Sequence, residues 1–194
     1  GQVIKDVLEI DTSVVSTDHE QIASEAERAG IRAPFFRPKV LSGDRVSDLE
    51  VLTHALLKTE ELDKVIYDIV LMLQPTSPLR NASNVSDTIQ MLINGDWDAV
   101  WTVSETDSKS HPLKQLHVEK DRLSYYDEDG GKIIARQELK PVYHRNGIAY
   151  AISRDCLINK KSIKGINTGA LIIQGQHISI DTEWDLSLVN MISN

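Results

Sequence analysis

Apolar residues along the chain alternate between two kinds of spacing. Three segments repeat them every three or four positions, which is the spacing of one helix face: 17–30, 47–58 and 81–95. Four short runs are rich in β-branched or aliphatic residues, as strands are: 12–17, 31–36, 66–73 and 97–104. Strands and helices in this alternating order predict a parallel α/β sheet with right-handed crossover helices.

The predicted helices begin and end at residues that suit helix termini. Two of them open with the spacing of a capping box: Thr17 with Glu20, and Ser47 with Glu50. Asn81 is expected to cap the third helix. The residues expected on the inward faces are Ile22, Ala26 and Ala29, then Leu49, Leu52 and Leu56, then Val85, Ile89, Leu92 and Ile93. Two glycines are expected to end helices: Gly30 and Gly95.

The run Ile66–Leu73 is almost continuously apolar, which predicts a central parallel strand covered on both faces. It opens onto a loop, Gln74–Arg80, that holds two prolines, two hydroxyl side chains and an amide. Ligands of open α/β sheets bind beyond the carboxyl ends of the strands, and prolines stiffen a loop there. Gln74, Thr76 and Ser77 would then offer hydrogen-bonding groups at little ordering cost. A proline-rich turn that only caps a helix has the same composition, so the residues alone predict a polar site without naming its ligand.

The alternation breaks between Glu105 and Pro141, where short polar stretches predict a hairpin-like excursion from the sheet. After it, the pattern predicts a strand with a short helix at 146–157, another strand at 168–174 and a closing helix at 181–192. The first ten residues have the pattern of the end of a helix. A single domain over residues 1–194 is therefore expected.

The composition is globular, with 41% hydrophobic and 26% charged residues in 194. A formal charge of −8 argues against a general nucleic-acid binder, which needs a basic face. The sequence shows neither an apolar run of transmembrane length nor a signal-peptide pattern, so no membrane partner is expected. The single cysteine, Cys156, suits a cytoplasmic location and a small core residue. Three histidines lack the spacing of a metal site and are assigned no chemistry: His54, His111 and His144.

Six blocks of the chain, in order, resemble the CMP-sialic acid synthetases (acylneuraminate cytidylyltransferases). They are "VVSTDHEQIASEAERAG", "FFRPKVLSGD", "LMLQPTSPLR", "HPLK", "RQELKPVYHRNGIAYAI" and "SIDTEWDL". The resemblance spans nearly the whole chain and implies a three-layer, Rossmann-like, mostly parallel sheet with helices on both faces. It implies an enzyme that joins a nine-carbon 2-keto sugar acid to CTP and releases pyrophosphate, with N-acetylneuraminate as the leading sugar.

The same resemblance implies roles for individual residues. It assigns the sugar site to Gln74, Thr76, Ser77, Asn146 and Tyr150. Lys114 and Arg136 match family cations for the sugar carboxylate or the α-phosphate, and Arg37 matches an arginine on the nucleotide side. Ser47 lies in a segment that approaches CTP in relatives. Asp181 matches a carboxylate that binds the catalytic Mg²⁺, so Mg²⁺ is the expected cofactor, and Arg136 and Asp181 are expected to carry the chemistry. From the residues alone, Lys114 and Arg136 are solvated surface charges, and Arg37 belongs to a turn before Pro38. Ser47 and Asp181 are then helix-terminus residues.

The chain departs from the family pattern in two places. Relatives carry a phosphate loop with glycine, lysine and arginine after their first strand, and that block has no counterpart here. The domain is therefore expected to lack its N-terminal strand and phosphate loop. Relatives also show two aspartates where this chain has Ser179 and Asp181, and a serine binds Mg²⁺ less strongly than a carboxylate. The expected metal site is weaker, recruits another carboxylate such as Asp185, or uses bound water.

The excursion at 105–141 resembles the family's dimerisation arm, which reaches the sugar site of the neighbouring subunit. The resemblance therefore predicts a homodimer with two shared active sites. Two alternatives to an N-acetylneuraminate enzyme stay open. One is a cytidylyltransferase for legionaminate or a related nonulosonic acid. The other is a non-catalytic nucleotide-binding, sugar-binding or assembly module that kept the fold.

Overall fold

The computed structural model describes residues 2–175 and 177–192, and its centre is a four-stranded sheet. The strands lie in the order β1 (Ile69–Met72), β5 (Tyr143–Ser153), β2 (Ala99–Glu105) and β6 (Thr168–Ile172). β1, β2 and β6 run in one direction, and β5 runs against them, because it pairs antiparallel with both of its neighbours. The expected mostly parallel sheet is confirmed in strand direction, with one antiparallel strand inserted at its middle.

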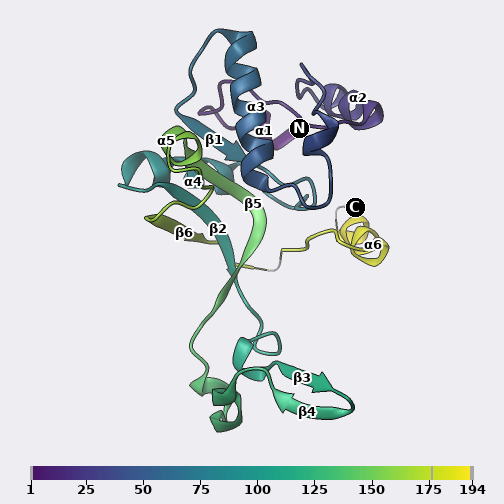
Figure 1. The fold of residues 1–194 in the computed structure, drawn as a ribbon, viewed down its shortest axis with the longest axis vertical. Helices are drawn as coiled ribbons and strands as arrows, with labels where there is room; N and C mark the ends of the chain where they lie inside the picture. Colours follow the sequence, from purple (N-terminus) through teal and green to yellow (C-terminus); the bar gives the residue numbers. More distant parts are fainter. Residues whose placement is uncertain (1, 176, 193–194) are drawn as a thin grey trace.

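Helices cover both faces of this sheet and give a three-layer architecture (Figure 1). On one face lies α4 (Ala82–Asn94), and the segment that follows α1 (Gln2–Lys5) joins it: buried Val7 packs with Val85 and Ile89 against β5. On the other face lie α3 (Asp48–Asp63) and α5 (Arg154–Ile158), whose buried residues pack against β2 and β5. Cys156 is a buried residue of this second cluster, as expected.

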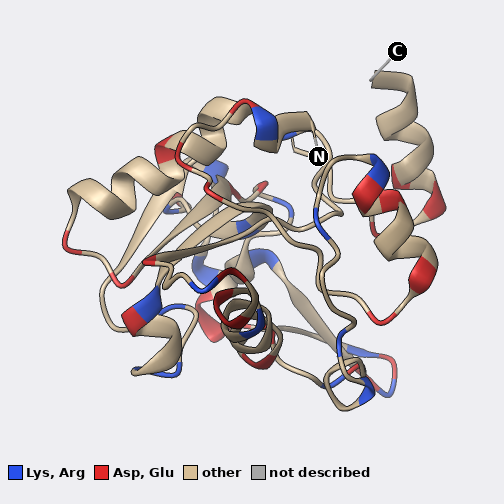
Figure 2. Ribbon diagram, turned by 90° about the horizontal axis from the view of Figure 1, so that it is seen from above, with Lys and Arg blue, Asp and Glu red and all other residues tan. Residues whose placement is uncertain are grey.

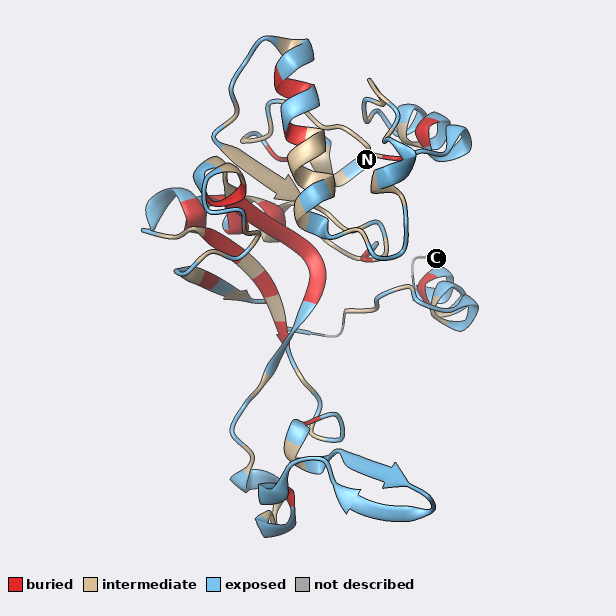
Figure 3. Cartoon of the chain, viewed as in Figure 1, coloured by how far each residue is buried: buried red, intermediate tan, exposed pale blue. Residues whose placement is uncertain are grey.

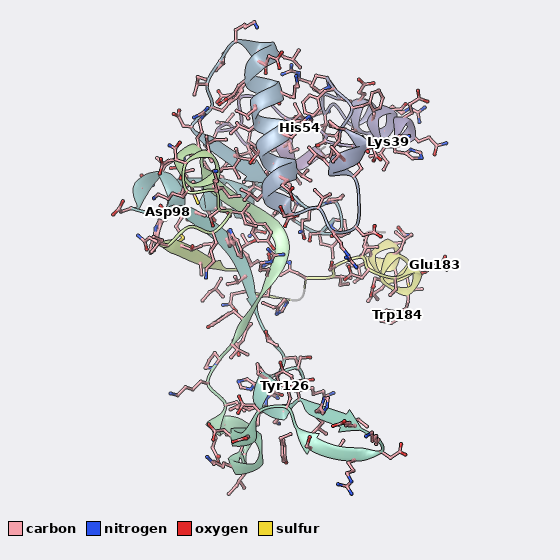
Figure 4. The ribbon with its side chains drawn as sticks, viewed as in Figure 1. Lys39, His54, Asp98, Tyr126, Glu183 and Trp184 are labelled. Carbon is pink, nitrogen blue, oxygen red and sulfur yellow. The ribbon has the colours of Figure 1, made fainter. Side chains whose placement is uncertain are left out.

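Two further helices flank these layers: α2 (Glu20–Arg28) and α6 (Glu183–Ile192). A short 3-10 helix, η1 (Lys39–Leu41), precedes α3. Figure 1 shows α6 standing apart from the sheet, and Trp184 on its outer side is exposed (Figure 4). In the part of the chain that the structure describes, no helix is both long and apolar enough to cross a bilayer.

Most of the predicted helix ends are found where expected. Ser47 and Glu50 form the capping box of α3, and the Asn81 side chain accepts from the Asn84 N–H at the start of α4. The prediction for α2 was wrong: the helix begins at Glu20 with His19 as its cap. The Thr17 hydroxyl accepts from the His19 N–H instead, at 3.1 Å.

Two of the three predicted inward faces differ in detail from the structure. In α2 the buried residue is Ala23, while Ile22 is half exposed. In α4 the expected Val85, Ile89 and Leu92 are buried, but Ile93 is half exposed at the last turn. Leu56 of α3 is buried, and Leu49 and Leu52 pack against the same cluster, as predicted.

The first two predicted strands are reduced to a single bridge between Val14 and Arg32. The Val15 N–H donates to the Arg32 carbonyl at 2.8 Å, and the Arg32 N–H donates to the Ser13 carbonyl at 3.1 Å. Pro34, which has no N–H, follows two residues later and cannot extend the ladder. These segments therefore run side by side without forming a regular strand pair.

The position predicted for the run Ile66–Leu73 was also wrong. Its regular part, β1, lies at the edge of the described sheet and is only half buried. β5 lies between β1 and β2, so β1 has a strand of the described sheet on one side only. An apolar run indicates burial of both faces of a strand, but it does not specify which strand pairs with it.

Residues 106–142, called the arm, leave the sheet between β2 and β5 (Figure 1). The arm contains the hairpin β3 (Leu116–Glu119) and β4 (Arg122–Tyr125), and three 3-10 turns: η2 (Pro112–Lys114), η3 (Glu128–Lys132) and η4 (Arg136–Glu138). The hairpin-like excursion predicted from the sequence is therefore present. Every residue of β3 and β4 is exposed, whereas the buried residues gather in the sheet and its helices (Figure 3).

Candidate functional site

Residues 74–80, called the strand-end loop, follow the carboxyl end of β1 and are tied to β5. The Gln74 N–H donates to the Gly147 carbonyl at 3.3 Å, and the buried Ser77 hydroxyl donates to the Asn146 carbonyl at 2.8 Å. The Ser77 N–H also donates to the Gln74 carbonyl, which closes a turn within the loop. The loop is therefore held in one shape by bonds to a strand nearly 70 residues away in sequence.

Arg80 also holds this shape, and sequence reasoning assigned it no role. Its guanidinium donates to the carbonyl of Ser77 at 2.9 Å, to that of Gln74, and to that of Gly147 at 3.5 Å. Burial lowers the pKa of Arg80 to about 10, so it stays charged at neutral pH. Among the described residues it forms no ion pair, so carbonyl dipoles alone balance its charge.

Gly147 lets the loop and the strand approach each other closely. Its φ is +72°, and a Cβ there would lie 2.5 Å from both Gln74 Oε1 and Ser77 Oγ. The Gly147 N–H donates to the Tyr150 hydroxyl at 2.7 Å. Any side chain at this position would push the loop away from β5, so glycine is required by space as well as by backbone conformation.

Asn146 and Tyr150, predicted to face the sugar, have side chains that are occupied inside the protein. The Asn146 carbonyl oxygen Oδ1 accepts from the Thr102 hydroxyl at 2.6 Å and from the Ile148 N–H at 3.1 Å, and its Nδ2 donates to Ser104 at 3.0 Å. Tyr150 is buried, and burial raises the pKa of its hydroxyl. Both residues support the strand-end loop from beneath. Gln74 and Thr76 are half-buried, so these two polar residues of the loop stay partly accessible.

The segment that precedes α6 reaches the same place. The Ile180 N–H donates to the Thr76 carbonyl at 2.8 Å, which brings the exposed Asp181 beside the strand-end loop. Asp185, the other candidate carboxylate, accepts from the Thr182 N–H at 2.8 Å and from the Thr182 hydroxyl at 2.7 Å. These hydrogen bonds lower the pKa of Asp185 and commit it to the start of α6. Asp181 is thus the free carboxylate of this segment.

The donor set has a limited capacity for a metal. The described residues include no group of three or more His, Cys, Asp or Glu side chains that could hold an ion. Mg²⁺ in nucleotide enzymes is held by one or two carboxylates together with substrate phosphates and water. A single free carboxylate at Asp181 fits an ion of that kind and does not fit a dedicated protein cage.

The charged surroundings of Tyr150 come from three different elements. The residues near enough to act on its hydroxyl are Arg145 of β5, Asp48 of α3 and Arg80 of the strand-end loop. The start of α3, where Ser47 forms its capping box, therefore faces the same end of the sheet as the loop. Ser47 has its hydroxyl engaged with Glu50 at 2.7 Å.

Arg37, predicted to lie on the nucleotide side, is half buried in front of α3. Its Nε donates to Ser42 at 3.3 Å, and its Nη2 lies 3.9 Å from Asp18. His54 on α3 stacks edge-on against Phe35, with ring centroids 5.4 Å apart. Burial lowers the pKa of His54, and the positive charges of Lys58 and Arg37 lower it further, so His54 is neutral at pH 7.

Lys114 and Arg136 lie in the arm, and no bond of the described residues joins them to the strand-end loop. Arg136 lines a hollow of about 300 Å³ at the base of the arm, together with Glu105 and His111. His111 is buried: its Nδ1 accepts from the Leu113 N–H at 3.2 Å, and its Nε2 donates to the Lys140 carbonyl at 3.0 Å. The structure thus brings together the loop residues and Asp181, but leaves the two arm cations apart from them.

The chain is similar in sequence to a known protein family and to several characterised proteins. A family model described as cytidylyltransferase matches residues 1–186. Post-translational flagellin modification protein B of Campylobacter coli is 27% identical over 180 residues, which cover 92% of this chain and 75% of that protein. The CMP-N,N'-diacetyllegionaminic acid synthase of Legionella pneumophila is 28% identical over 182 residues, covering 92% and 76%. The N-acylneuraminate cytidylyltransferase of Escherichia coli is 27% identical over 178 residues, covering 90% and 40%.

Solved structures show the same fold at lower identity. The structure of CMP:2-keto-3-deoxy-manno-octonic acid synthetase complexed with CTP superposes with a TM-score of 0.65 and 16% identity, covering 99% of this chain and 84% of that one. A 4-diphosphocytidyl-2C-methyl-D-erythritol synthase from Anaerococcus prevotii has a TM-score of 0.58 and 15% identity, covering 99% and 85%. The Rossmann-like fold class predicted from the sequence is confirmed by these likenesses.

Proposed function

The chain belongs to the cytidylyltransferase family and is a nucleotidyltransferase, and we propose that it joins CTP to a nonulosonic acid. The products are the CMP-sugar and pyrophosphate. The observation that carries this proposal is the strand-end loop, held by Arg80 and β5 next to Asp181. A rigid polar loop beside a free carboxylate suits a polyhydroxylated acid and a metal-bound triphosphate.

Within this proposal the predicted sugar residues divide into two groups. Gln74 and Thr76 contact the sugar, because their side chains are accessible at the carboxyl end of β1. Ser77, Asn146 and Tyr150 hold the loop and β5 in place, since their polar atoms are already paired inside the protein. A site built this way discriminates against analogues that lack a hydroxyl or amide, because a preformed partner is then left unpaired.

In the proposed reaction the anomeric hydroxyl of the sugar attacks the α-phosphorus of CTP in line. The bond from that phosphorus to the β-phosphate oxygen breaks, pyrophosphate leaves, and the hydroxyl proton passes to solvent. Arg37 and Ser47 lie on the nucleotide side, and Asp181 would hold Mg²⁺. When bound, Mg²⁺ neutralises charge on the phosphates. The contribution of the protein is orientation, which can supply a large share of the rate in a transfer between two bound substrates.

The placement of Lys114 and Arg136 in the arm supports a homodimer in which each arm serves the partner subunit. The arm exposes apolar residues that a monomer would leave in water: Leu116, Val118, Leu123, Tyr125 and Tyr126. Figure 4 shows Tyr126 in the arm, well separated from the sheet that carries Asp98. A second copy that covers these residues would also bring Lys114 and Arg136 to a strand-end loop.

The identity of the sugar is the finer part of the proposal. Two of the relatives named above carry a sugar in their names: N,N'-diacetyllegionaminic acid in one and an N-acylneuraminate in the other. N-acetylneuraminate and legionaminates share the carboxylate, the anomeric hydroxyl and the N-acyl group, so the strand-end loop suits both.

Turnover tests this function directly. The full-length protein is mixed with CTP, MgCl₂ and, in separate reactions, N-acetylneuraminate, N,N'-diacetyllegionaminate and pseudaminate. We expect pyrophosphate release and a CMP-sugar mass with at least one of them. If CTP binds but no nonulosonic acid yields pyrophosphate, the chain is a nucleotide-binding module and the proposal fails.

A further inference from the structure

Arg145 is an arginine that neither the resemblance nor the bonds of the core account for. It is exposed on β5, and its guanidinium carbon lies 5.1 Å from the centroid of the Trp101 ring and 5.6 Å from that of the Tyr150 ring. Contact with two aromatic faces restricts a guanidinium that would otherwise sample many rotamers. The side chain is therefore held in place without using its N–H donors.

The two rings that carry Arg145 are themselves fixed at their polar ends. The Trp101 Nε1–H donates to the Ile163 carbonyl at 3.0 Å, and the Tyr150 hydroxyl accepts from the Gly147 N–H at 2.7 Å. The rings are 5.3 Å apart and tilted at 49° to each other. Together they form an aromatic platform beneath Arg145, with Trp101 supplied by β2 and Tyr150 by β5.

A register shift between β2 and β5 brings Arg145 to this platform. Trp101 pairs with Tyr150, but Val103, two residues along β2, already pairs with Arg145. Between these two pairs, the four residues 146–149 of β5 lie opposite the single residue Thr102 of β2, and Gly147 at φ +72° makes the irregularity possible. Without this shift, Arg145 would lie farther along the strand from both rings.

No carboxylate of the described residues neutralises Arg145. Other arginines of the chain do have such partners: Arg28 with Glu25, Arg32 with Asp63, Arg37 with Asp18, and Arg154 with Glu60. Asp48 acts on the same tyrosine from α3 but forms no ion pair with Arg145. A fixed guanidinium with free N–H donors is prepared for an oxyanion that arrives from solution.

The platform adjoins the strand-end loop. Gly147 donates to the Tyr150 hydroxyl through its N–H and accepts from the Gln74 N–H through its carbonyl. Arg145 is thus separated from Gln74 by one tyrosine and one glycine. An anion on Arg145 would lie at the edge of the site that the loop defines.

We propose that Arg145 binds an oxyanion of the substrates and is held for that purpose over Trp101 and Tyr150. The inference rests on the proposed function and adds a specificity-determining residue to it. Two groups of the substrates could supply this oxyanion: the carboxylate of the sugar and a phosphate of the nucleotide. Both are planar-guanidinium ligands that carry one or two negative charges. The two sources are separated by the ligands used in the test.

The test compares Arg145→Gln and Arg145→Lys with the parent protein and with Arg28→Gln, which removes a positive charge from exposed α2. For the sugar, we measure the KM of the acid at saturating CTP and the inhibition constant of its carboxamide, which lacks the charge. For the nucleotide, we measure the KM of CTP and the inhibition constant of cytidine. Losing a charge-assisted hydrogen bond costs about tenfold to a hundredfold in affinity.

If the carboxylate is the ligand, Arg145→Gln raises the KM of the acid by that factor and leaves the carboxamide and CTP unchanged. If a phosphate is the ligand, the KM of CTP rises and cytidine is unchanged. Arg145→Lys keeps the charge but loses the planar fork, so its loss is smaller, and Arg28→Gln shows none. Provided that the parent turns over, the proposal is overturned if Arg145→Gln loses affinity equally for charged and uncharged ligands, or loses none. A parent without turnover on any nonulosonic acid overturns the proposed function itself.

A second variant tests the platform. Trp101→Leu keeps the Arg145 charge but removes the larger ring beneath it, and we expect a loss of affinity in the same direction for the charged ligand only. The thermal midpoint is measured alongside. An unchanged charged-ligand KM in a folded Trp101→Leu protein contradicts the role of the rings.

Discussion

At the scale of single residues, Arg80 carries a positive charge into the protein and balances it with backbone carbonyls alone. The three carbonyls belong to the strand-end loop and to β5, so one side chain fixes both ends of a loop that would otherwise move. Moving a charge out of water is expensive, and an unpaired buried carbonyl is costly as well. Each group therefore satisfies the other, and Arg80 adds to the bonds by which Gln74 and Ser77 tie the loop to β5.

Replacing Arg80 should loosen the loop more than it unfolds the protein. We expect Arg80→Met to lower the free energy of unfolding by about 1–3 kcal/mol, because the Ser77 carbonyl loses its donor and the Gln74 and Gly147 carbonyls each lose one of two. Hydrogen exchange should rise at Gln74 and Ser77, and the KM of the sugar acid should rise about tenfold. Arg80→Lys should give values of stability and sugar KM between those of the parent and those of Arg80→Met. Added guanidinium ion should partly restore the sugar KM of Arg80→Met. Unchanged exchange at the loop in Arg80→Met contradicts this role.

A substitution at Gly147 can separate two effects: the steric clash between β5 and the strand-end loop, and the strain of a positive φ. Gly147 and Gly175 both have positive φ, but a Cβ at Gly147 meets Gln74 and Ser77, whereas one at Gly175 meets nothing within 4 Å. We expect Gly175→Ala to cost about 1–2 kcal/mol from strain alone. Gly147→Ala adds a steric clash and should cost about 2–5 kcal/mol with a raised sugar KM. Urea unfolding measures both, and equal costs would show that the clash is relieved.

The sequence allowed part of this site to be predicted at residue level. The strand-end loop was located from an apolar run followed by prolines and hydroxyl residues, and its position at a strand end is observed. Arg80 was missed because its partners are carbonyls, which every residue has and which leave no mark on a sequence. An arginine directly after a proline-rich loop, with no acid within one turn, is the signal that was available. The inward pairing of Asn146 depends on Thr102 and Ser104, and no spacing rule predicts that contact.

At the scale of elements, the individual strands and helices were more predictable than their neighbours. Capping residues and apolar stripes located α3 and α4, because these depend on contacts three or four residues apart. The place of β5 between β1 and β2 depends on pairing between residues at least 38 positions apart, which an apolar pattern does not encode. The edge position of β1 follows from that same pairing.

Asp98 shows how a side chain joins two elements. It lies immediately before β2 and binds the segment before β6 through Lys160 at 2.5 Å, the Ile166 N–H at 2.8 Å and the Asn167 N–H at 3.2 Å. These partners lower the pKa of Asp98 to about 2. Figure 4 places Asp98 at the end of the sheet away from the arm. The carboxylate therefore anchors the parallel pair of β2 and β6 where it begins.

This anchor should make stability depend on pH in acid. The folded pKa of Asp98 lies below its value of about 3.9 in an unfolded chain, so acid protonates the unfolded state first. Its contribution is complete above about pH 4 and is lost as pH falls through about 2. We expect Asp98→Asn to be less stable than the parent at pH 7, with the gap closing toward pH 2, by urea unfolding. The control is Asp155→Asn, because the Asp155 carboxylate lies 3.5 Å from the same Lys160. It should show a smaller difference in stability from the parent at pH 7. A gap independent of pH contradicts the assignment.

At the scale of the whole molecule, the charge opposes the proposed substrates. The chain carries a net charge of −8, and acidic and basic residues alternate around the ribbon (Figure 2). CTP and a sugar acid are both anions, so binding relies on local cations that outweigh the overall field. Near the strand-end loop these are Arg80 and Arg145, and the arm holds Lys114 and Arg136 away from the loop of its own chain.

The separation of arm and loop leads to a prediction that distinguishes shared from separate sites. Lys114→Ala/Arg136→Ala disables the arm, and Gln74→Ala disables the loop, so each purified protein alone should be nearly inactive. If the arm serves the partner subunit, a mixed dimer holds one intact site, made from the loop of the first protein and the arm of the second. Random exchange of subunits makes half of the dimers mixed, so activity should return to about a quarter of the parent value. Light scattering should report a dimer throughout. No recovery after exchange, or a fully active monomer, would show that each chain completes its own site.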